Sequence, residues 1–373
     1  MRITGGQVFD LKEGFVQREL CMDGGCVANA SADGKTYDAT GCYVIPGLTD
    51  VHFHGCQGAD FSDGDPQGLQ TMADYELSRG VTQICPAGMT LLEEQLTVIC
   101  KMAAAHKKSS TAGAELVGVN LEGPFLSYAK KGAQNGDWLH KPDADMLKRL
   151  IDVSGGLVKL VTVAAEEPGA MEFIDRAKDW VTVSLGHTTA DYDTAMEAYG
   201  LGASQATHLF NAMPPFTHRA PGVVGAAADS SHVRVELICD GVHIHPSVVR
   251  AVFKLFGAKR VVLISDSLRC TGMPDGKYPF GGQEIVLKGN RATLAHEPDT
   301  LAGSVTDLMG CVKKAAEFGI PLHDAVWAAA VNPAKAIGIF GRYGSLEPGK
   351  AANAAVLDEN LNLKAVIFQG NVL

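Results

Sequence analysis

Short apolar runs alternate with longer segments of helical periodicity through the middle of the chain. Each run is apolar at most positions, as expected for a strand buried on both faces. The runs lie at Tyr43–Thr49, Val81–Cys85, Leu116–Leu121, Val158–Ala164, Val181–Leu185, Gln205–Leu209, Val233–Ile238 and Arg260–Ile264. The helical patterns lie at Gln67–Arg79, Leu92–Lys107, Asp143–Val153, Met171–Lys178, Thr194–Tyr199 and Ser247–Phe256. Strands that alternate with helices in this way predict a parallel sheet.

The number of strands favours one kind of parallel α/β fold. Eight predicted strands indicate a (β/α)8 TIM-type barrel rather than a doubly wound sheet. No G-x-G-x-x-G fingerprint follows any of them, so the usual sign of a dinucleotide-binding fold is missing. Gly276–Leu294 is typical of a polar hairpin, and helical patterns at Thr306–Phe318 and Leu322–Ala330 would close the ring.

Both ends of the chain show short strand-like segments separated by turns. These segments are Gly6–Asp10, Gly24–Ala28, Lys35–Ala39, Ala354–Asp358 and Ala365–Gly370. We predict that the two ends form one small β-sandwich domain of residues 1–44 and 345–373. The barrel would then occupy residues 45–344.

Composition narrows the classes of partner. With 42 acidic and 32 basic side chains the formal net charge is -10, and no basic stripe is present to neutralise nucleic-acid phosphates. No run approaches the ~18 apolar residues of a membrane helix, and the first residues lack a signal-peptide pattern. Nine cysteines without a C-x-x-C pair fit a reducing compartment. We therefore expect a soluble cytoplasmic protein that binds neither nucleic acid nor membrane.

Histidines and carboxylates gather at the predicted strand ends, where barrels of this type carry their chemistry. Six of the eight ends contain such a residue. In chain order they are His52, His54, Glu122, His187, His208, Asp240, His243 and Asp266. Side chains at i and i+2 of a strand point the same way, so His52 and His54 could hold one ion together.

Each of these residues taken singly has an ordinary structural explanation. A lone His-x-His pair is a weak signal, a single His or Glu is more often a hydrogen-bonded polar group, and Asp266 could hold a loop backbone. The set is more specific, because five of the 12 histidines fall at predicted strand ends. Imidazole and carboxylate ligands with an open position for water are typical of zinc and related divalent metals.

Motifs in the same order along the whole chain then resemble one enzyme family. PGLTDVHFHG (Pro46–Gly55) resembles the first-strand signature of the amidohydrolase superfamily. The chain is similar to N-acetylglucosamine-6-phosphate deacetylases through further motifs. They are LEGPF (Leu121–Phe125), GHTTA (Gly186–Ala190), HLFNAM (His208–Met213), HRAPG (His218–Gly222), CDGVH (Cys239–His243) and LAGS (Leu301–Ser304).

The resemblance implies a reaction and a role for each motif. A metal-dependent barrel, usually a cytoplasmic homodimer, would hydrolyse the acetamide of N-acetyl-D-glucosamine 6-phosphate to D-glucosamine 6-phosphate and acetate. Glu122, His187 and His208 would hold the principal divalent metal, with zinc favoured and Fe, Mn or Co as alternatives. Asp266 would be the general base and acid, and His243 or Gln134 would stabilise the oxyanion. The substrate-binding residues would be Ala133, Gln134, Asn211, Ala212, Arg219, Asp240, His243, Leu301, Ala302 and Gly303.

The substrate phosphate requires a local cation on this acidic protein. Arg219 offers a planar fork suited to phosphate, just past the sixth predicted strand. A surface salt bridge is the ordinary explanation of such a residue. In dimers of this kind the arginine could also reach the neighbouring subunit's site.

Three features bear on the number of metal ions, which we leave at one or two. Many amidohydrolases bridge two metals with a carboxylated lysine after strand four, but Thr162–Glu166 has none, and Glu122 could supply the bridging oxygens instead. Some members lack the first-strand histidines, whereas His52 and His54 are both present. Gln134 stands where a His is common, and its amide cannot become cationic. We hypothesise that a second metal at His52 and His54 offsets this loss as a Lewis acid.

Two alternatives stay open. A deacetylase for N-acetylgalactosamine 6-phosphate, or another N-acyl amidohydrolase, is the nearest, because no motif resolves the orientation of one hydroxyl. A metal-free barrel scaffold is the non-enzyme alternative, which the joint presence of the strand-end residues disfavours.

Overall fold

The computed structural model describes residues 1–30 and 34–373 of the chain. Parallel strands form an open ring of two sheets, with strand orders β12-β14-β15-β16-β17-β18-β19 and β13-β11-β8. These strands are β8 (Leu48–Asp50), β11 (Val81–Ile84), β12 (Ala87–Gly88), β13 (Glu115–Leu116), β14 (Val119–Leu121), β15 (Val158–Val163), β16 (Thr182–Leu185), β17 (Gln205–Ala206), β18 (Arg234–Ile238) and β19 (Val261–Ile264). Two residues past the ends of β19 and β8, the Asp266 amide donates to the His52 carbonyl at 2.9 Å. This bond joins the two ends of the ring, so the fold is an α/β barrel.

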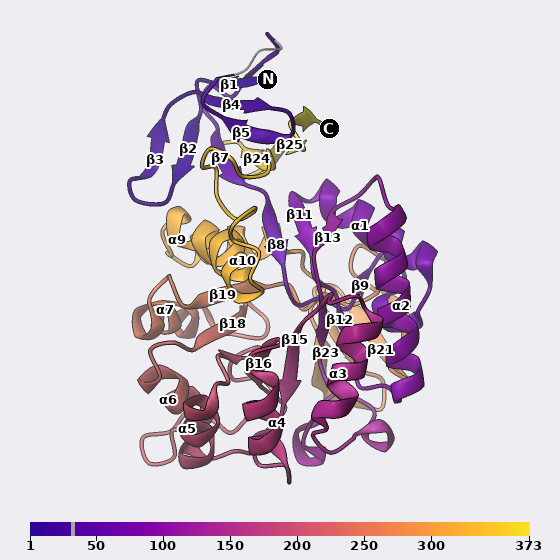
Figure 1. Cartoon of the computed structure of the whole chain (residues 1–373). Coiled ribbons are helices and arrows are strands. Elements are labelled where there is room, and N and C mark those ends of the chain that lie inside the picture. The colour runs from indigo at the N-terminus through magenta and orange to yellow at the C-terminus, as the bar shows by residue number, and fades with distance from the viewer. Residues whose placement is uncertain (31–33) are drawn as a thin grey trace.

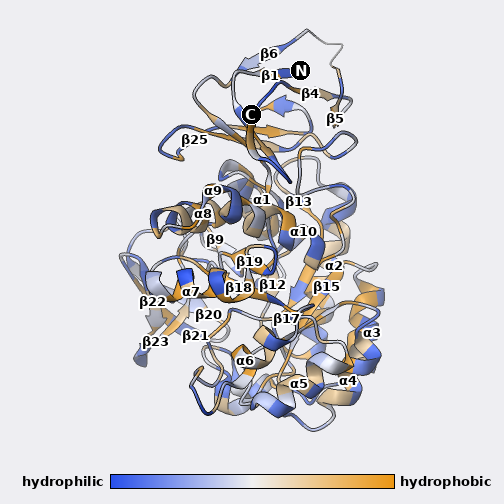
Figure 2. Ribbon diagram, turned by 90° about the vertical axis from the view of Figure 1, so that its left-hand side faces the viewer, coloured by the Kyte–Doolittle hydropathy of each residue, from blue (hydrophilic) through white to orange (hydrophobic). Residues whose placement is uncertain are grey.

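Helices cover the outside of the ring (Figure 1). They are α1 (Pro66–Ser78), α2 (Glu93–Ser109), α3 (Ala144–Val153), α4 (Ala170–Ala177), α5 (Tyr192–Leu201), α6 (Gly222–Asp229), α7 (Pro246–Phe256), α8 (Leu308–Glu317), α9 (Leu322–Val326) and α10 (Asn332–Ala336), with a π-helical turn at Trp327–Val331. Several begin at an aspartate whose carboxylate accepts backbone N–H groups of the first turn, as Asp65 does for α1 and Asp143 for α3. Figure 2 shows the hydrophobic strands β15, β18 and β19 inside and the helices around them.

Helix α6 has no counterpart among the predicted helices. Its sequence is GVVGAAAD, and Gly222, Val223, Val224, Gly225, Ala226 and Ala227 are all buried. With six of its eight residues buried, this helix has no amphipathic period for a sequence pattern to reveal.

The first predicted strand, Tyr43–Thr49, is two strands with different partners. Its first half, β7 (Tyr43–Pro46), pairs with a strand from the end of the chain, and its second half, β8, pairs with β11. The chain divides at Gly47, where a Cβ would lie 2.0 Å from the Thr82 hydroxyl. A glycine therefore allows the chain at the start of β8 to lie close to Thr82 of β11.

Both chain ends contribute to two further sheets, at the top of Figure 1. Their strand orders are β26-β25-β24-β7-β2-β3 and β5-β4-β1-β6. The strands are β1 (Arg2–Thr4), β2 (Gln7–Asp10), β3 (Gly14–Gln17), β4 (Leu20–Asp23), β5 (Cys26–Ala28), β6 (Thr36–Asp38), β24 (Ala354–Leu357), β25 (Leu363–Phe368) and β26 (Asn371–Val372). Ile3, Leu20, Val44, Val356 and Ile367 belong to one buried cluster drawn from both sheets.

The predicted hairpin is larger than its sequence pattern indicates. A four-stranded antiparallel sheet is formed by β20 (Gly276–Phe280), β21 (Gln283–Lys288), β22 (Arg291–Leu294) and β23 (Glu297–Gly303). After β23 the Ser304 amide donates to the Asp266 carbonyl at 2.8 Å. This sheet consequently delivers Leu301–Gly303 to the carboxyl end of the barrel.

The remaining elements of the described residues are short. They are β9 (Gly55–Cys56), β10 (Ala59–Asp60) and the 3-10 turns Phe61–Asp63, Tyr128–Lys130 and Gly136–Trp138. Among the described helices, none combines the length and the apolar character that crossing a bilayer requires.

Candidate active site

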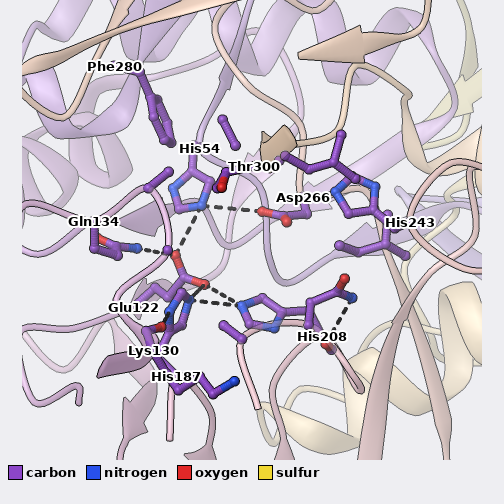
Figure 3. A pocket seen from close by; sticks show the side chains of 18 of the residues that line it. His54, Glu122, Lys130, Gln134, His187, His208, His243, Asp266, Phe280 and Thr300 are labelled. Atoms are coloured by element: carbon purple, nitrogen blue, oxygen red, sulfur yellow. Dashed lines mark hydrogen bonds and ion pairs between the residues drawn. The ribbon is translucent and has the colours of Figure 1, made fainter. Parts of the chain in front are cut away.

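A cavity of about 390 Å³ opens at the carboxyl end of the barrel strands. Its walls come from the strand ends and from the β20–β23 sheet. The lining includes His54, Glu122, Lys130, Ala133, Gln134, His187, His208, Asn211, Ala212, His243, Asp266, Phe280, Asp299, Thr300, Leu301, Ala302 and Gly303. Most of the site residues predicted from the sequence therefore share one cavity (Figure 3).

Two groups of three buried side chains could each hold a metal ion. One group is Glu122, His187 and His208, and the other is His52, His54 and Asp266. Within each group the ligand atoms lie within 4.8 Å of one another. The sequence had placed all six residues at strand ends, and the barrel brings these ends together.

Glu122 faces both groups, and its Oε1 also lies 3.2 Å from His52 Nε2. Its Oε1 lies 2.9 Å from His208 Nε2 and 3.2 Å from His187 Nε2. Its Oε2 lies 3.2 Å from His54 Nε2, which in turn is 3.3 Å from Asp266 Oδ1. Figure 3 shows His54, Glu122, Asp266 and His208 around this common space.

Hydrogen bonds at the far side of the rings fix which nitrogen faces the cavity. His54 Nδ1 lies 3.2 Å from the Ala87 carbonyl, and His187 Nδ1 lies 2.8 Å from the Lys130 carbonyl. A carbonyl only accepts, so each Nδ1 carries a proton and each Nε2 is the nitrogen that faces the cavity. Outer partners of this kind are typical of metal-binding histidines.

Opposite charges determine the ionisation of the cluster. Burial by itself lowers the pKa of His54, but hydrogen bonds to Asp266 and Glu122 raise it to about 10. Burial by itself raises the pKa of Glu122, but the imidazoles of His52 and His187 hold it well below its usual range. The pKa of Asp266 is lowered despite burial, through its hydrogen bond with His54 and the charge of His52. Both carboxyls are therefore carboxylates at neutral pH.

The donor set fits a divalent cation. His54 Nε2 faces two carboxylate oxygens, and His52 Nε2 is buried without a hydrogen-bond partner in the described structure. Lone pairs and carboxylate oxygens repel unless a proton or a metal ion lies between them. Imidazole nitrogen with carboxylate oxygen is the ligand chemistry of zinc, iron, manganese and cobalt.

Three of these residues have left-handed backbone conformations that a side chain makes costly. The φ angles are +47° at His187, +26° at His208 and +50° at Asp266. Such conformations persist only where the surrounding structure enforces them, and they gather at functional sites. The predicted strand Gln205–Leu209 correspondingly ends at Ala206, before His208.

Gln134 is held in one orientation beside Glu122. Its carbonyl oxygen accepts from the Thr90 amide at 2.8 Å, and its NH2 donates to Glu122 Oε2 at 2.6 Å. The amide hydrogen of Gln134 is thus directed at a carboxylate of the ligand cluster.

His243 is oriented by Asp240, three residues earlier. Asp240 accepts from His243 Nδ1 at 2.7 Å and also from the amides of Val242 and His243. Burial raises the pKa of Asp240, but these bonds lower it overall. Asp240 does not line the cavity itself, whereas His243 does.

The structure does not bring Arg219 into the cavity. This residue is exposed on the loop after β17 and is absent from the lining. Lys130, which is not among the predicted site residues, does line the cavity. The sequence feature that could have indicated Lys130 is its position, four residues before the predicted site residue Gln134.

A second residue missed from the sequence is Glu236, on β18. It is fully buried, and its Oε2 lies 2.9 Å from His52 Nδ1. The signal was an acidic residue in the middle of the apolar run Val233–Ile238.

Comparison with known proteins agrees with this geometry. The model of the amidohydrolase family matches residues 43–373. This chain belongs to the amidohydrolase family. Amidohydrolases are metal-dependent, and the matched range contains both groups of candidate ligands.

Deacetylases within the family are similar to this chain over most of its length. The N-acetylglucosamine-6-phosphate deacetylase of Bacillus subtilis (strain 168) is 37% identical over 334 residues, covering 88% of this chain and 84% of that protein. The N-acetylgalactosamine-6-phosphate deacetylase of Escherichia coli O157:H7 is 32% identical over 331 residues, covering 88% of this chain and 87% of that protein. These findings confirm the resemblance drawn from the motifs.

Solved structures of this kind superpose over the whole chain. An alanine variant of N-acetyl-D-glucosamine-6-phosphate deacetylase from Mycobacterium smegmatis, in complex with N-acetyl-D-glucosamine-6-phosphate, gives a TM-score of 0.92. It is 32% identical, and the match covers 100% of this chain and 98% of that one.

Proposed function

We propose that this amidohydrolase hydrolyses the acetamide of N-acetyl-D-glucosamine 6-phosphate to D-glucosamine 6-phosphate and acetate. The observation that carries the proposal is the meeting of Glu122, His187 and His208 with Asp266 in one buried cluster beside a cavity. The relatives that match most of the chain support the same substrate class.

Glu122, His187 and His208 would hold the principal metal, and His52, His54 and Asp266 would face a second one. Zinc is the favoured ion, with Fe, Mn or Co as alternatives. When bound, a divalent ion of this kind polarises carbonyl oxygens and makes water a stronger acid. His54 Nε2 and His187 Nε2 face Glu122, so both nitrogens would be placed to hold such an ion.

Asp266 moves the proton of the reaction. Its lowered pKa keeps it ionised at neutral pH, so it can accept a proton from water as the water oxygen bonds to the acetamide carbon. It then donates that proton to the sugar nitrogen as the carbon–nitrogen bond breaks. An amine leaves far more easily when it is protonated.

His243 and Gln134 would direct donors toward the reacting amide. Asp240 holds the His243 ring by its Nδ1, which leaves Nε2 for the substrate. Gln134 is bonded to Glu122, so its remaining amide hydrogen would have to serve the substrate. The hypothesis that a second ion compensates for Gln134 stays a prediction. One ion per fully active subunit would contradict it.

Polar and backbone groups around the cavity would bind the sugar phosphate. Asn211, Ala212, Ala133 and the Leu301–Gly303 segment line the walls. Lys130 supplies a cation in the same subunit. Arg219, which is exposed, would contribute from a neighbouring subunit of a homodimer.

The architecture supports a division into two domains. Residues 1–44 and 345–373 would form the small β-sandwich domain, and residues 45–344 the catalytic barrel. The separate buried cluster that contains Ile3, Val44 and Ile367 supports this division. We further propose a cytoplasmic homodimer without nucleic-acid or membrane partners.

Acetate release from a panel of phosphorylated and free N-acetylhexosamines, with and without chelator, tests the function. We expect chelator-sensitive release from N-acetylglucosamine 6-phosphate. Faster release from the galacto epimer would instead favour the specificity of the similar Escherichia coli O157:H7 protein. A protein that purifies without metal and releases no acetate would be a barrel scaffold.

A further inference from the structure

Glu236 is a buried carboxylate that connects the two candidate metal groups. It lies on β18 with none of its surface exposed, and its side chain reaches the centre of the ring. Its Oε2 lies 2.9 Å from His52 Nδ1 and accepts the His208 amide at 3.1 Å. Its Oε1 accepts Gln205 Nε2 at 2.6 Å.

These contacts fix the protonation pattern of His52. The His208 amide can only donate, so Oε2 of Glu236 is an acceptor. His52 Nδ1 therefore carries the proton and donates it to the same oxygen. Its Nε2 then faces the opposite side.

That side is where the second group of ligands lies. His52 Nε2 is 3.2 Å from Glu122 Oε1 and 3.8 Å from Asp266 Oδ1, and it is buried without a hydrogen-bond partner among the described residues. His52 Nε2 can face two carboxylate oxygens at these distances only with a proton or a metal ion between them. The contact with Glu236 thus leaves a site that a cation would complete.

We propose that Glu236 is a positioning residue that makes the His52, His54 and Asp266 group competent to bind a second divalent ion. It does so by placing a carboxylate against His52 Nδ1, which leaves His52 Nε2 facing Glu122 and Asp266. The inference rests on the proposed metal-dependent site.

Metal content at controlled free zinc tests the proposal directly. Wild-type protein and the Glu236→Gln variant are stripped with chelator and equilibrated with increasing zinc, and bound zinc per chain is measured by mass spectrometry. Glutamine keeps the shape of the side chain and can still accept from His208, but it lacks the charge. We expect two zinc ions in the wild type, with the second bound about 10–100-fold more weakly in Glu236→Gln.

Two further variants separate positioning from folding. Glu115→Gln removes a carboxylate on β13 that bonds to Lys107 and Tyr343 instead of a metal group, and it should bind zinc like the wild type. Glu236→Asp keeps the charge but withdraws it from His52, so it should also weaken the second ion. Melting of the zinc-free proteins checks that each variant folds.

The following results would overturn the proposal: one zinc ion in the wild type, unchanged second-ion affinity in both Glu236 variants, or failure of both variants to fold without zinc. The last result would assign the carboxylate to the fold. Acetate release is scored separately. A wild type that holds two ions but releases no acetate refutes the proposed function and leaves the role of Glu236 intact.

Discussion

At the scale of single residues, the site depends on side chains held where the backbone disfavours them. His187, His208 and Asp266 all have positive φ angles. Interactions around them impose these conformations, because each costs about 1–3 kcal/mol. Glu166 shows how this is done, since it accepts hydrogen bonds from Thr188 and Thr189 immediately after His187.

Replacing Asp266 by Asn should abolish most activity without unfolding the protein. The amide cannot accept and return the proton, so we expect kcat to fall by about 10²–10⁴-fold. The measurement is steady-state acetate release, with circular dichroism as the check on folding. Asp193→Asn, on the exposed face of α5, is the matched control and should keep wild-type kcat. A fall in kcat below tenfold for Asp266→Asn would assign the proton transfer to another group.

Two cations can be compared for recognition of the phosphate. Lys130→Ala and Arg219→Ala should each raise KM for the phosphorylated substrate by about ten- to hundredfold, as expected for loss of a charge-assisted hydrogen bond. KM for unphosphorylated N-acetylglucosamine should stay unchanged. Lys131→Ala is the control, because Lys131 does not line the cavity.

The contribution of Arg219 to KM should depend on whether the protein is a dimer. If the arginine serves a neighbouring subunit, dilution to monomers should reproduce its loss in the wild type. Equal losses on phosphorylated and free sugars would argue against a phosphate role for either residue.

At the scale of elements, the structure departs from the sequence patterns where an element lacks a periodic face or changes partner. Helix α6 is buried over its first six residues, so no amphipathic period marks it. The run Tyr43–Thr49 looks like one strand, because the residues on either side of Gly47 are equally apolar. Only the pairing of β7 with β24 and of β8 with β11 separates the two halves.

Gly47→Ala should destabilise the protein because the added methyl group would overlap Thr82. The Cβ would lie 2.0 Å from the Thr82 hydroxyl, and we expect a loss of about 1–3 kcal/mol. Gly200→Ala is the matched comparison, because a Cβ at this position in α5 meets nothing within 4 Å. It should stabilise the helix by about 0.5–1 kcal/mol. Thermal melting of both variants measures the two effects. A Gly47→Ala protein that melts at the wild-type temperature would show that β8 can move away from β11.

At the scale of the whole molecule, a protein of net charge -10 concentrates buried carboxylates at the centre of its barrel. Glu122, Glu236 and Asp266 lie among imidazoles instead of Lys or Arg side chains. The barrel can bury this arrangement because the strand ends present ligands from all sides at once. Divalent cations would complete it.

Chelation should therefore lower both activity and stability. A zinc site adds about 2.7 kcal/mol to the free energy of unfolding when free zinc is 100 times its Kd. Chelation would remove this stabilisation. We expect zinc, manganese, iron or cobalt to restore the melting temperature and acetate release. Magnesium should not, because it prefers oxygen ligands to imidazole. Full recovery with magnesium alone would contradict a histidine-based metal site.

The sequence by itself determined the alternation of strands and helices, the barrel class and the residues at the strand ends. These features are local, because periodicity and position after an apolar run are properties of neighbouring residues. Only the tertiary structure decided that Glu122 faces both metal groups, that Glu236 supports His52 from within β18, and that Lys130 and not Arg219 lines the cavity. Those relations join residues far apart in the chain. They arise when the closed ring brings the ends of separate strands to one point.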